Sequence, residues 1–399
     1  MTGDRATRVL AVFALISGCG FLLLNPLRLA FIANVLIPFL YFNLFLMLCC
    51  GFLFLLKVRT LEVKPVEVFL CLLVFATAFT TNYDGRSIIS VLTDLFRPIL
   101  FIFVVVVFRN LVNVDGFNAS ASLRNWIKFS MWVTVIIVAV SWFVTLFIFP
   151  LYPAYSSIDS IFGMGWLLAT GNIFTQAAYF LVLVASGKRG AYLAAFVVIF
   201  LCYRNVKLSL VSWAWIFFSV FFALVLLVLY AEDVQRVFLK GASYDSLQGI
   251  SGFMHILSGG RLEELQGAIA GMTSPMQFIF GAGLGFAYEA KGFEGAAGGH
   301  RNLHFTPASL AIYYGIPFAI VFFYYLSTFF YAALRMMRDY TNVVIFCYAV
   351  YCMASMFFLF TEFSVFAYVN FAISCGVVAA AAKAERRSLQ ARENDSVVN

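Results

Sequence analysis

The fold is decided by apolar stretches such as SIISVLTDLFRPILFIFVVVVF, which runs from Ser87 to Phe108 and contains only two charged residues. About 18 consecutive apolar residues are enough for a helix to cross the hydrocarbon core of a membrane. In that core every backbone N–H and C=O group must be paired within the chain, and an α-helix meets this condition. The stretch therefore predicts a transmembrane helix.

The composition of the whole chain agrees with this stretch. Of its 399 residues, 63% are hydrophobic and 11% are charged, which lies far outside the range of soluble globular proteins. We expect an all-α polytopic membrane protein with about ten to twelve transmembrane helices. The eight cysteines lie in apolar stretches without a C-x-x-C spacing and are typical of small core residues, so neither a disulfide framework nor a zinc site is expected.

The basic residues indicate how the chain is oriented. The net charge is +7, but the cations gather in short segments between apolar stretches, which favours cytoplasmic loops over a nucleic-acid partner. Arg5 and Arg8 precede the first apolar stretch, and Lys383, Arg386 and Arg387 follow the last one. Both termini are therefore expected on the cytoplasmic side of the membrane.

The order of apolar and polar stretches predicts four segments. These are an N-terminal transmembrane bundle (1–230), a large polar loop (231–305), C-terminal transmembrane helices (306–382, with one span over 306–331) and a disordered cytoplasmic tail (383–399). Three crossings between residues 129 and 203 would place the next basic loop on the wrong side. We therefore expect a broken or re-entrant segment near 161–187, where glycines interrupt the apolar pattern, and the number of full crossings between 129 and 203 stays open.

The polar loop contains all three histidines of the chain, His255, His300 and His304. It also contains Arg261, which opens a stretch with apolar residues at helical spacing and predicts an amphipathic helix on the membrane surface. A cation in the first turn of a helix is not favoured by the helix dipole, so Arg261 should have an anionic partner. That partner is either a phosphate group or a nearby carboxylate such as Glu264.

Arginines and a histidine at one water boundary predict a specific chemistry. Arg189 and Arg261 could hold a lipid-linked pyrophosphate and stabilise its charge as it leaves, while His304 takes a proton from an attacking hydroxyl group. This site needs neither a metal nor a cofactor. The alternatives are that Arg189 binds lipid headgroups and that His304 is a hydrogen-bonded histidine at the interface. Zinc binding by His300 and His304 would require a third ligand for which the sequence has no spacing signature.

Two further motifs allow more than one interpretation. Asp94 and Arg97 lie three residues apart on one face of the predicted helix 87–108, where they either neutralise each other or let Arg97 face a substrate groove. The run Gly281-Ala282-Gly283-Leu284-Gly285 lacks the strand, helix and acidic residue of a nucleotide-binding motif. It predicts a tight turn at which the backbone approaches another part of the chain closely.

Four landmarks together resemble a known family. They are Lys188-Arg189-Gly190-Ala191, Gly260-Arg261-Leu262, the glycine run from Gly281 to Gly285, and His304 eleven residues before Gly315. In order and spacing they are similar to those of the O-antigen ligase and polymerase superfamily, membrane glycosyltransferases with a GT-C-like fold that use undecaprenyl-pyrophosphate-linked sugars. The resemblance covers roughly residues 187–322. Phe305 stands where the family usually has asparagine, so the base could be His300 or His304.

The resemblance implies a polymerase of the bacterial inner membrane that joins lipid-linked oligosaccharide repeats at the periplasmic face. Its partners would be the undecaprenyl-pyrophosphate-linked donor and acceptor, membrane lipids and a chain-length regulator protein. The rival functions are a ligase that transfers glycan to lipid A-core and a flippase for lipid-linked oligosaccharides. The implied site consists of a catalytic set, namely His304, Arg261 and Arg189, and a substrate-binding set, namely Arg301, His300, Arg97 and Glu264.

Overall fold

The computed structural model describes residues 2–24, 30–56, 61–147, 158–185, 189–203, 261–289, 303, 305–338, 342–360 and 365–398. These residues are about 86% helical and include no strand, which confirms an all-α fold. Three helices among them are long and apolar enough to cross a membrane, so the chain has the character of a membrane protein. These are α4 (Ile88–Leu111), the first 20 residues of α6 (Ala121–Phe147), and α16 (Ile316–Arg338).

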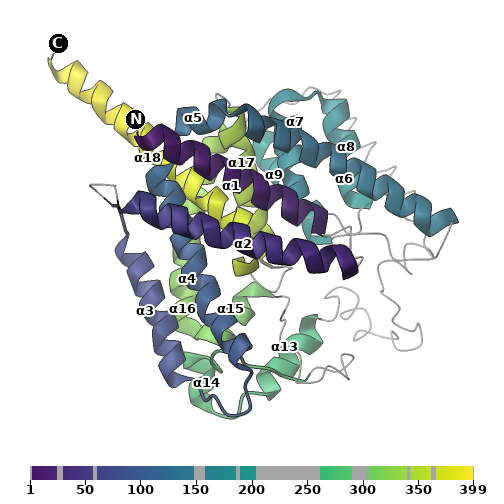
Figure 1. Ribbon diagram of the computed structural model, residues 1–399, viewed down its shortest axis with the longest axis vertical. Helices are drawn as coiled ribbons and strands as arrows, with labels where there is room; N and C mark the ends of the chain where they lie inside the picture. The colour runs from purple at the N-terminus through teal and green to yellow at the C-terminus, as the bar shows by residue number, and fades with distance from the viewer. Residues whose placement is uncertain are drawn as a thin grey trace.

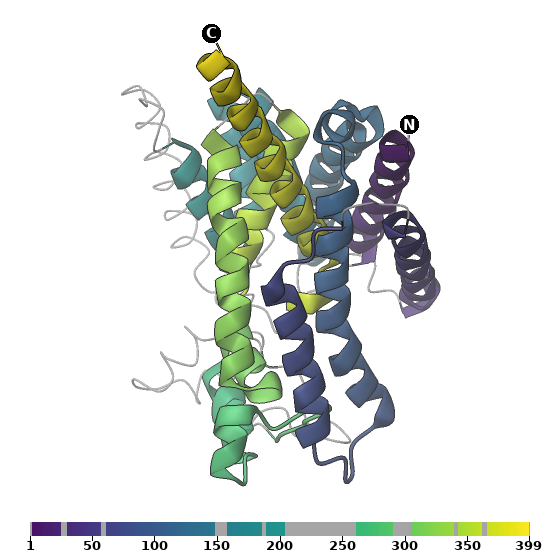
Figure 2. The ribbon, with the colours of Figure 1, turned by 90° about the vertical axis from the view of Figure 1, so that its left-hand side faces the viewer.

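The other helices are arranged around these three (Figure 1). They are α1 (Thr2–Leu24), α2 (Ala30–Leu55), α3 (Pro65–Thr80), α5 (Val114–Ala119), α7 (Ile161–Thr170), α8 (Ile173–Ala185), α9 (Arg189–Tyr203), α13 (Arg261–Ala270), α14 (Pro275–Phe280), α15 (Thr306–Tyr314), α17 (Val343–Phe358) and α18 (Val369–Val398), with 3₁₀ turns η1 (Ile158–Ser160) and η3 (Val365–Ala367). Both termini lie at one end of the molecule, whereas α13 and α14 lie at the opposite end (Figure 1). Figure 2 shows α16 running along most of the distance between the two ends.

Helix α17 forms the centre of the bundle. Every residue from Val344 to Met356 is buried, and α7, α9, α16 and α18 pack around the helix. A helix that is apolar on all sides is expected in such a position. Helix α7 comes close because it carries Gly165, where an added Cβ would lie 3.1 Å from the Cα of Cys347. Close packing at this glycine therefore fixes α7 against the central helix.

A buried ion pair joins α3, α4 and α16 near the end that holds the termini. The guanidinium group of Arg109 donates through Nη1 and Nη2 to the two carboxylate oxygens of Glu67, the second bond being 2.8 Å long. Tyr325 Oη donates to Glu67 Oε1 at 2.7 Å, and the backbone N–H of Lys64 donates to Oε2 at 2.8 Å. Arg109 is therefore a buried residue of α4, which continues to Leu111, and its side chain is 2% exposed.

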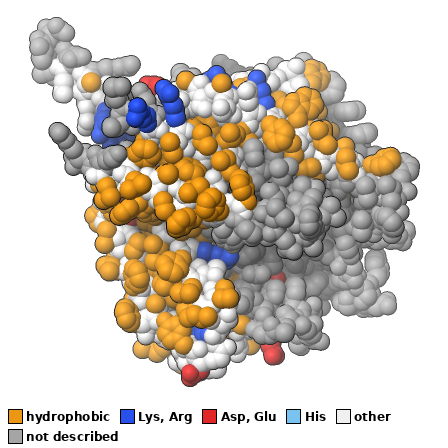
Figure 3. Space-filling model, in the orientation of Figure 1, with side chains coloured by type: hydrophobic (Ala, Val, Ile, Leu, Met, Phe, Trp, Pro, Cys, Tyr) orange, Lys and Arg blue, Asp and Glu red, His pale blue; other side chains and the backbone are white. Residues whose placement is uncertain are grey.

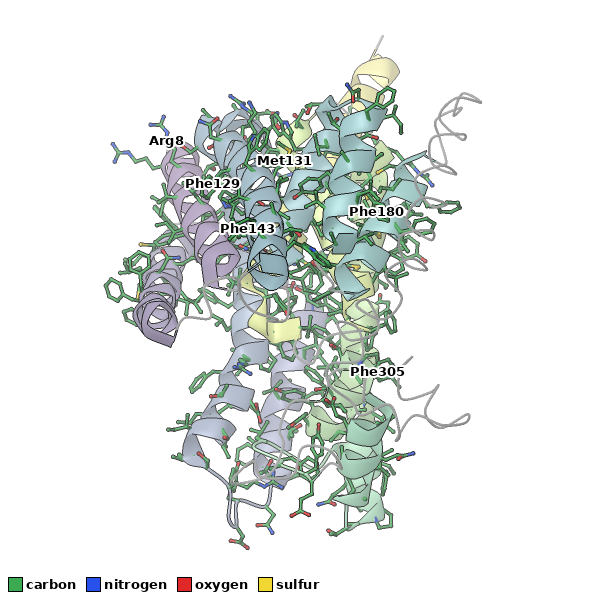
Figure 4. The ribbon with its side chains drawn as sticks, turned by 90° about the vertical axis from the view of Figure 1, so that its right-hand side faces the viewer. Arg8, Phe129, Met131, Phe143, Phe180 and Phe305 are labelled. Atoms are coloured by element: carbon green, nitrogen blue, oxygen red, sulfur yellow. The ribbon has the colours of Figure 1, made fainter. Side chains whose placement is uncertain are left out.

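The surface separates into an apolar flank and a basic end. Large hydrophobic side chains such as Phe45 on α2 and Phe75 on α3 are exposed, and they cover the flank seen in Figure 3. Such a surface suits contact with lipid tails. Lysine and arginine side chains gather at the end that holds both termini (Figure 3), and Arg8 marks this end in Figure 4. We call it the basic end.

Two sequence-based expectations about helix boundaries are wrong. The span expected over 306–331 is broken between α15 and α16 at Gly315, whose φ of +90° is a backbone conformation that favours glycine. The tail expected to be disordered beyond residue 382 is helical, because α18 continues without interruption to Val398. The charges at Lys383 and Glu385 are paired with Glu62 and Arg335, which holds the emerging helix against its neighbours.

The glycine-interrupted segment near 161–187 forms two short helices rather than one span. Helix α7 ends at Thr170 and α8 begins at Ile173, after Gly171 in an extended conformation. The Lys128 ammonium lies 5.0 Å from the ring centroid of Trp166 on α7. Tyr179 Oη on α8 donates to the carbonyl oxygen of Ser160, just before α7, at 2.8 Å, so the chain turns back at the glycine.

Candidate active site

The end of the molecule opposite the basic end contains α13, α14 and the glycine turn. Helix α14 begins where Pro275 occupies the first helical position and Ser274 caps the N-terminus, with Ser274 Oγ accepting from the backbone N–H of Met276 at 3.3 Å. Gln277 completes a capping box, and the helix stops at Gly281 because its φ is +87°. The sequence therefore positions the glycine turn directly after a short, well-capped helix.

The glycine run forms the tight turn that its sequence predicts. Gly281, Gly283 and Gly285 have φ values of +87°, +92° and +73°, which other residues rarely adopt. A Cβ at Gly281 would lie 2.7 Å from the backbone N of Gly315, and one at Gly283 would lie 2.5 Å from Thr81 Oγ1. The glycines are therefore required by conformation and by close approach, and the segment approached is the protein's own chain.

Arg86 holds this turn against the membrane bundle. Its Nη1 donates to the carbonyl oxygen of Leu284 at 2.5 Å, and its Nη2 donates to that of Ala282 at 2.8 Å. The backbone N–H of Leu284 donates to Thr81 Oγ1 at 3.0 Å. Burial lowers the pKa of Arg86 from its ordinary value, but an arginine pKa lies so far above neutrality that the group stays charged. We call Arg86, Thr81 and their contacts on the glycine turn the Arg86 anchor.

The carboxylate of Asp94 on α4 contacts the glycine turn. Asp94 Oδ2 accepts from the backbone N–H of Gly285 at 2.8 Å, and its carbonyl oxygen accepts from Tyr314 Oη at 2.7 Å. Asp94 thus ties the glycine turn and α15 to α4. Arg97 is half-buried one helical turn further along. The first interpretation, in which Asp94 serves mainly to neutralise Arg97, therefore does not account for the contacts of this carboxylate.

The structure describes only some of the predicted site residues. Arg261 is the first residue of α13 and Arg189 the first residue of α9, but their side chains lie outside the described part of the chain. His300, Arg301 and His304 also lie outside the described residues. Glu264 is described and is 1% exposed, on the side of α13 that faces the protein. Burial, and to a smaller extent the Glu264 carboxylate, raises the pKa of the Tyr288 hydroxyl above its ordinary value.

The neighbours of His304 are fixed in place. Leu303 is fully buried, and the ring of Phe305 lies 6.2 Å from that of Phe360, between centroids. The backbone N–H of Thr306 donates to the carbonyl oxygen of Leu359 at 3.1 Å. Phe305 is labelled in Figure 4, where it lies at the start of α15 on the α13 side of the molecule. Phe305 therefore leads into α15 beside the end of α17.

The start of α9 lies away from Lys128, which is near the start of α6. Trp142 on the distal part of α6 donates through Nε1 to the carbonyl oxygen of Ala185 at 2.9 Å, so α8 ends far from Lys128. Only three residues separate α8 from α9, and the two helices pack together, so they must run in opposite directions. Arg189 therefore begins α9 at the end of these helices that faces away from the basic end. The described part of α13 packs on α15.

A buried carboxylate that sequence reasoning missed lies in η1, the 3₁₀ turn just before α7. Asp159 is 1% exposed, and its Oδ1 accepts from Tyr351 Oη at 2.9 Å and from Asn370 Nδ2 at 3.0 Å. Its carbonyl oxygen accepts from Ser130 Oγ at 3.1 Å. The sequence feature that could have identified Asp159 is its position between two apolar stretches, just before the expected break at 161–187. An ionisable group at such a depth marks a functional or organising position.

The comparisons with known proteins leave the family open. No protein-family model matches the chain, and a comparison with curated proteins finds no related sequence. Within the described residues, no three His, Cys, Asp or Glu side chains come together as a metal site would require. The structure thus shows an all-α membrane protein. Its glycine turn is anchored at the end opposite the termini.

Proposed function

We propose that the protein is a membrane glycosyltransferase that polymerises oligosaccharide repeats carried on undecaprenyl pyrophosphate. The observation that carries the proposal is the Arg86 anchor, which fixes the glycine turn 281–285 at the end opposite the basic end. By the distribution of basic residues, the basic end faces the cytoplasm and the anchored end faces the periplasm of a bacterial inner membrane. Lipid-linked repeats would be presented at that face.

The first residues of two helices supply the proposed phosphate-binding groups. Arg189 opens α9 and Arg261 opens α13, and both helix N-termini carry partial positive charge from unpaired backbone N–H groups. A guanidinium group at such a position adds a bidentate donor suited to phosphate oxygens. Buried Glu264 orients α13 rather than contacting solvent. Arg97, Arg301 and His300 complete the proposed substrate contacts.

In the proposed reaction the acceptor sugar hydroxyl attacks the anomeric carbon of the donor. The new glycosidic C–O bond forms as the C–O bond to the diphosphate breaks, and undecaprenyl pyrophosphate leaves with the bonding electrons. His304 accepts the hydroxyl proton, and the two arginines stabilise the charge on the leaving diphosphate. Direct attack inverts the configuration at the anomeric carbon. The family resemblance provides these roles, with His300 as the alternative base.

Reconstitution tests this proposal. The full-length protein in lipid vesicles, supplied with undecaprenyl-pyrophosphate-linked repeats, should produce a ladder of polymers on a gel. His304→Ala should abolish the ladder, whereas His300→Ala removes only a proposed substrate contact and should lower the amount of polymer without abolishing it. Arg261→Lys should lower the rate, because lysine keeps the charge but loses the bidentate geometry. A reversed response of the two histidine variants would move the base to His300.

The rival functions give different products in the same vesicles. A ligase would attach glycan to lipid A-core once and would form no ladder from repeats alone. A flippase would move lipid-linked repeats across the bilayer without forming a glycosidic bond. A full-length protein that flips repeats and never joins them would refute the glycosyltransferase proposal.

A further inference from the structure

Arg97 is a cation within a transmembrane helix. It lies nine residues after Ile88, the first residue of α4, which is about 14 Å along the helix axis. Among the residues that the structure describes, its guanidinium group has no hydrogen-bond or ion-pair partner, and no ion pair joins it to Asp94 one turn earlier. A charge at membrane depth is costly unless it meets an opposite charge or water. The position therefore favours an anionic ligand.

The backbone beside Arg97 is fixed by α15. Pro98 has no N–H group, so the carbonyl oxygen of Asp94, four residues earlier, lacks its helical donor. Tyr314 Oη on α15 takes that place and donates to this oxygen at 2.7 Å. The Asp94 carboxylate accepts from the backbone N–H of Gly285 at 2.8 Å. Arg97 is therefore held in place relative to both α15 and the glycine turn.

Aromatic contacts bring Arg97 towards the segment that precedes α15. One turn after Arg97, the ring of Phe101 lies 5.8 Å from that of Phe366 in η3, between centroids. The ring of Phe305, just before α15, lies 6.2 Å from that of Phe360. Phe360 and Phe366 are six residues apart, and that length of chain spans at most about 22 Å. Arg97 thus lies in the same region of the molecule as the entry to α15.

Arg97 also lies where α4 changes from a partly exposed to a buried helix. No residue from Phe101 to Leu111 is exposed, whereas the outer half of α4 has four exposed apolar residues, namely Ile88, Ile89, Leu92 and Phe96. Ser90, Thr93 and Arg97 are half-buried and recur every three or four residues, so they form one polar stripe at the edge of that exposed face. Figure 3 shows basic side chains at mid-height beside the apolar flank, apart from those at the basic end.

The direction of the helix determines where the Arg97 guanidinium can reach. The Cα–Cβ bond of a helical residue tilts towards the N-terminus of its helix, and the N-terminus of α4 lies at the end opposite the basic end. The long Arg97 side chain therefore extends towards the water boundary at that end, while its stem stays beside apolar residues. A ligand that meets it there has a charged group at this boundary and an apolar part within the membrane.

We propose that Arg97 binds the diphosphate of the lipid-linked donor from the membrane side, while the exposed face of α4 contacts its polyprenyl chain. The inference rests on the proposed function for the identity of the lipid. A guanidinium group suits a diphosphate because it donates two parallel N–H bonds to phosphate oxygens. Arg189 and Arg261 remain the contacts from the water side, so the diphosphate is held between them and Arg97.

Binding of undecaprenyl diphosphate, which carries no sugar, measures this contact apart from turnover. The full-length protein in detergent is titrated with the lipid, and bound lipid is counted by native mass spectrometry. Arg97→Gln should weaken binding at least tenfold, because a hydrogen bond to a charged group is worth about that factor. Arg97→Lys should weaken it less, since lysine keeps the charge and loses only the bidentate geometry. Unchanged affinity in Arg97→Gln would overturn the proposal.

Two controls establish that the contact is specific. Arg338→Gln removes an exposed cation at the end of α16, near the basic end, and should leave the affinity unchanged. Phosphatidylglycerol has a single phosphate group and should bind about tenfold more weakly than undecaprenyl diphosphate. Equal binding of the two lipids, with both weakened by Arg97→Gln, would identify a general phospholipid site and refute the diphosphate assignment.

Polymer formation in vesicles separates this inference from the proposed function. Arg97→Gln should raise the KM for lipid-linked repeats about tenfold while the ladder still forms at high substrate concentration. A wild-type ladder with unchanged KM and unchanged lipid binding in Arg97→Gln would refute the role of Arg97 and leave the glycosyltransferase proposal standing. Wild-type protein that binds the lipid through Arg97 and forms no glycosidic bond would support the site and refute the proposed reaction.

Discussion

Replacing Glu67 with alanine should destabilise the protein more than any other single change near the basic end. The substitution leaves the Arg109 guanidinium buried without its counter-ion, and it also removes the acceptor for Tyr325 Oη and for the Lys64 N–H. Removing one partner of a buried ion pair costs about 3–5 kcal/mol. That loss is a large share of the roughly 5–15 kcal/mol by which folded proteins are stable.

A set of variants separates the charge from the rest of the cluster. Tyr325→Phe removes one neutral donor and should cost about 1 kcal/mol. Glu67→Leu combined with Arg109→Met removes both charges and leaves apolar side chains of similar size, so the double variant should be more stable than Glu67→Leu alone. The free energy of unfolding, measured by reversible unfolding in mixed detergent micelles, gives each value. The reasoning is refuted if the double variant loses the sum of the two single losses, because the charges would then not interact.

Three further predictions follow from other sites. Gly283→Ala should cost more free energy of unfolding than Gly85→Ala, because both positions have positive φ but only a Cβ at residue 283 meets another atom, at 2.5 Å, whereas residue 85 faces open space. Asp159→Ala should cost about 2–4 kcal/mol because it orphans two buried donors, whereas Asp159→Asn keeps one acceptor oxygen and should cost about half as much by the same unfolding assay. The hydrogen bond from Lys383 lowers the pKa of the Glu62 carboxyl below its ordinary value, so stability from this pair is present above pH 4.5 and is lost as the pH falls through the lowered pKa. A Glu62→Gln variant should show a flatter dependence of unfolding free energy on pH in that acidic range, and an unchanged slope would contradict the assignment.

The sequence predicts local features of the fold well. The span expected over 87–108 is α4 at Ile88–Leu111, because its long apolar run determines the helix locally. The glycine run predicts a tight turn, because glycine readily adopts the positive φ values that such a turn requires. These features depend on residues close together in the chain, so their signal can be read from one sequence.

Features that depend on distant residues could not be predicted in this way. Glu67 and Tyr325 are 258 residues apart, and Arg86 and Leu284 are 198 apart, so nothing in either neighbourhood identifies the partner. The break at Gly315 follows from the approach of the Phe280 backbone, whose carbonyl carbon would lie 2.7 Å from an added Cβ. The proposed catalytic roles come from the family resemblance and remain predictions. The anchoring of the glycine turn comes from the structure.

The contacts of Asp159 have a consequence for how the protein is made. Its Oδ1 receives hydrogen bonds from Tyr351 and Asn370, which lie 192 and 211 residues later in the chain. At roughly 5–20 residues per second, a ribosome needs about 10–40 seconds to add the intervening chain. During that interval the Asp159 carboxylate lacks its two final hydrogen-bond donors. The segment that leads into α7 must therefore stay in water or at the insertion machinery, or the carboxyl group must be protonated. The N-terminal half of the bundle is therefore completed only after its last two helices have been synthesised.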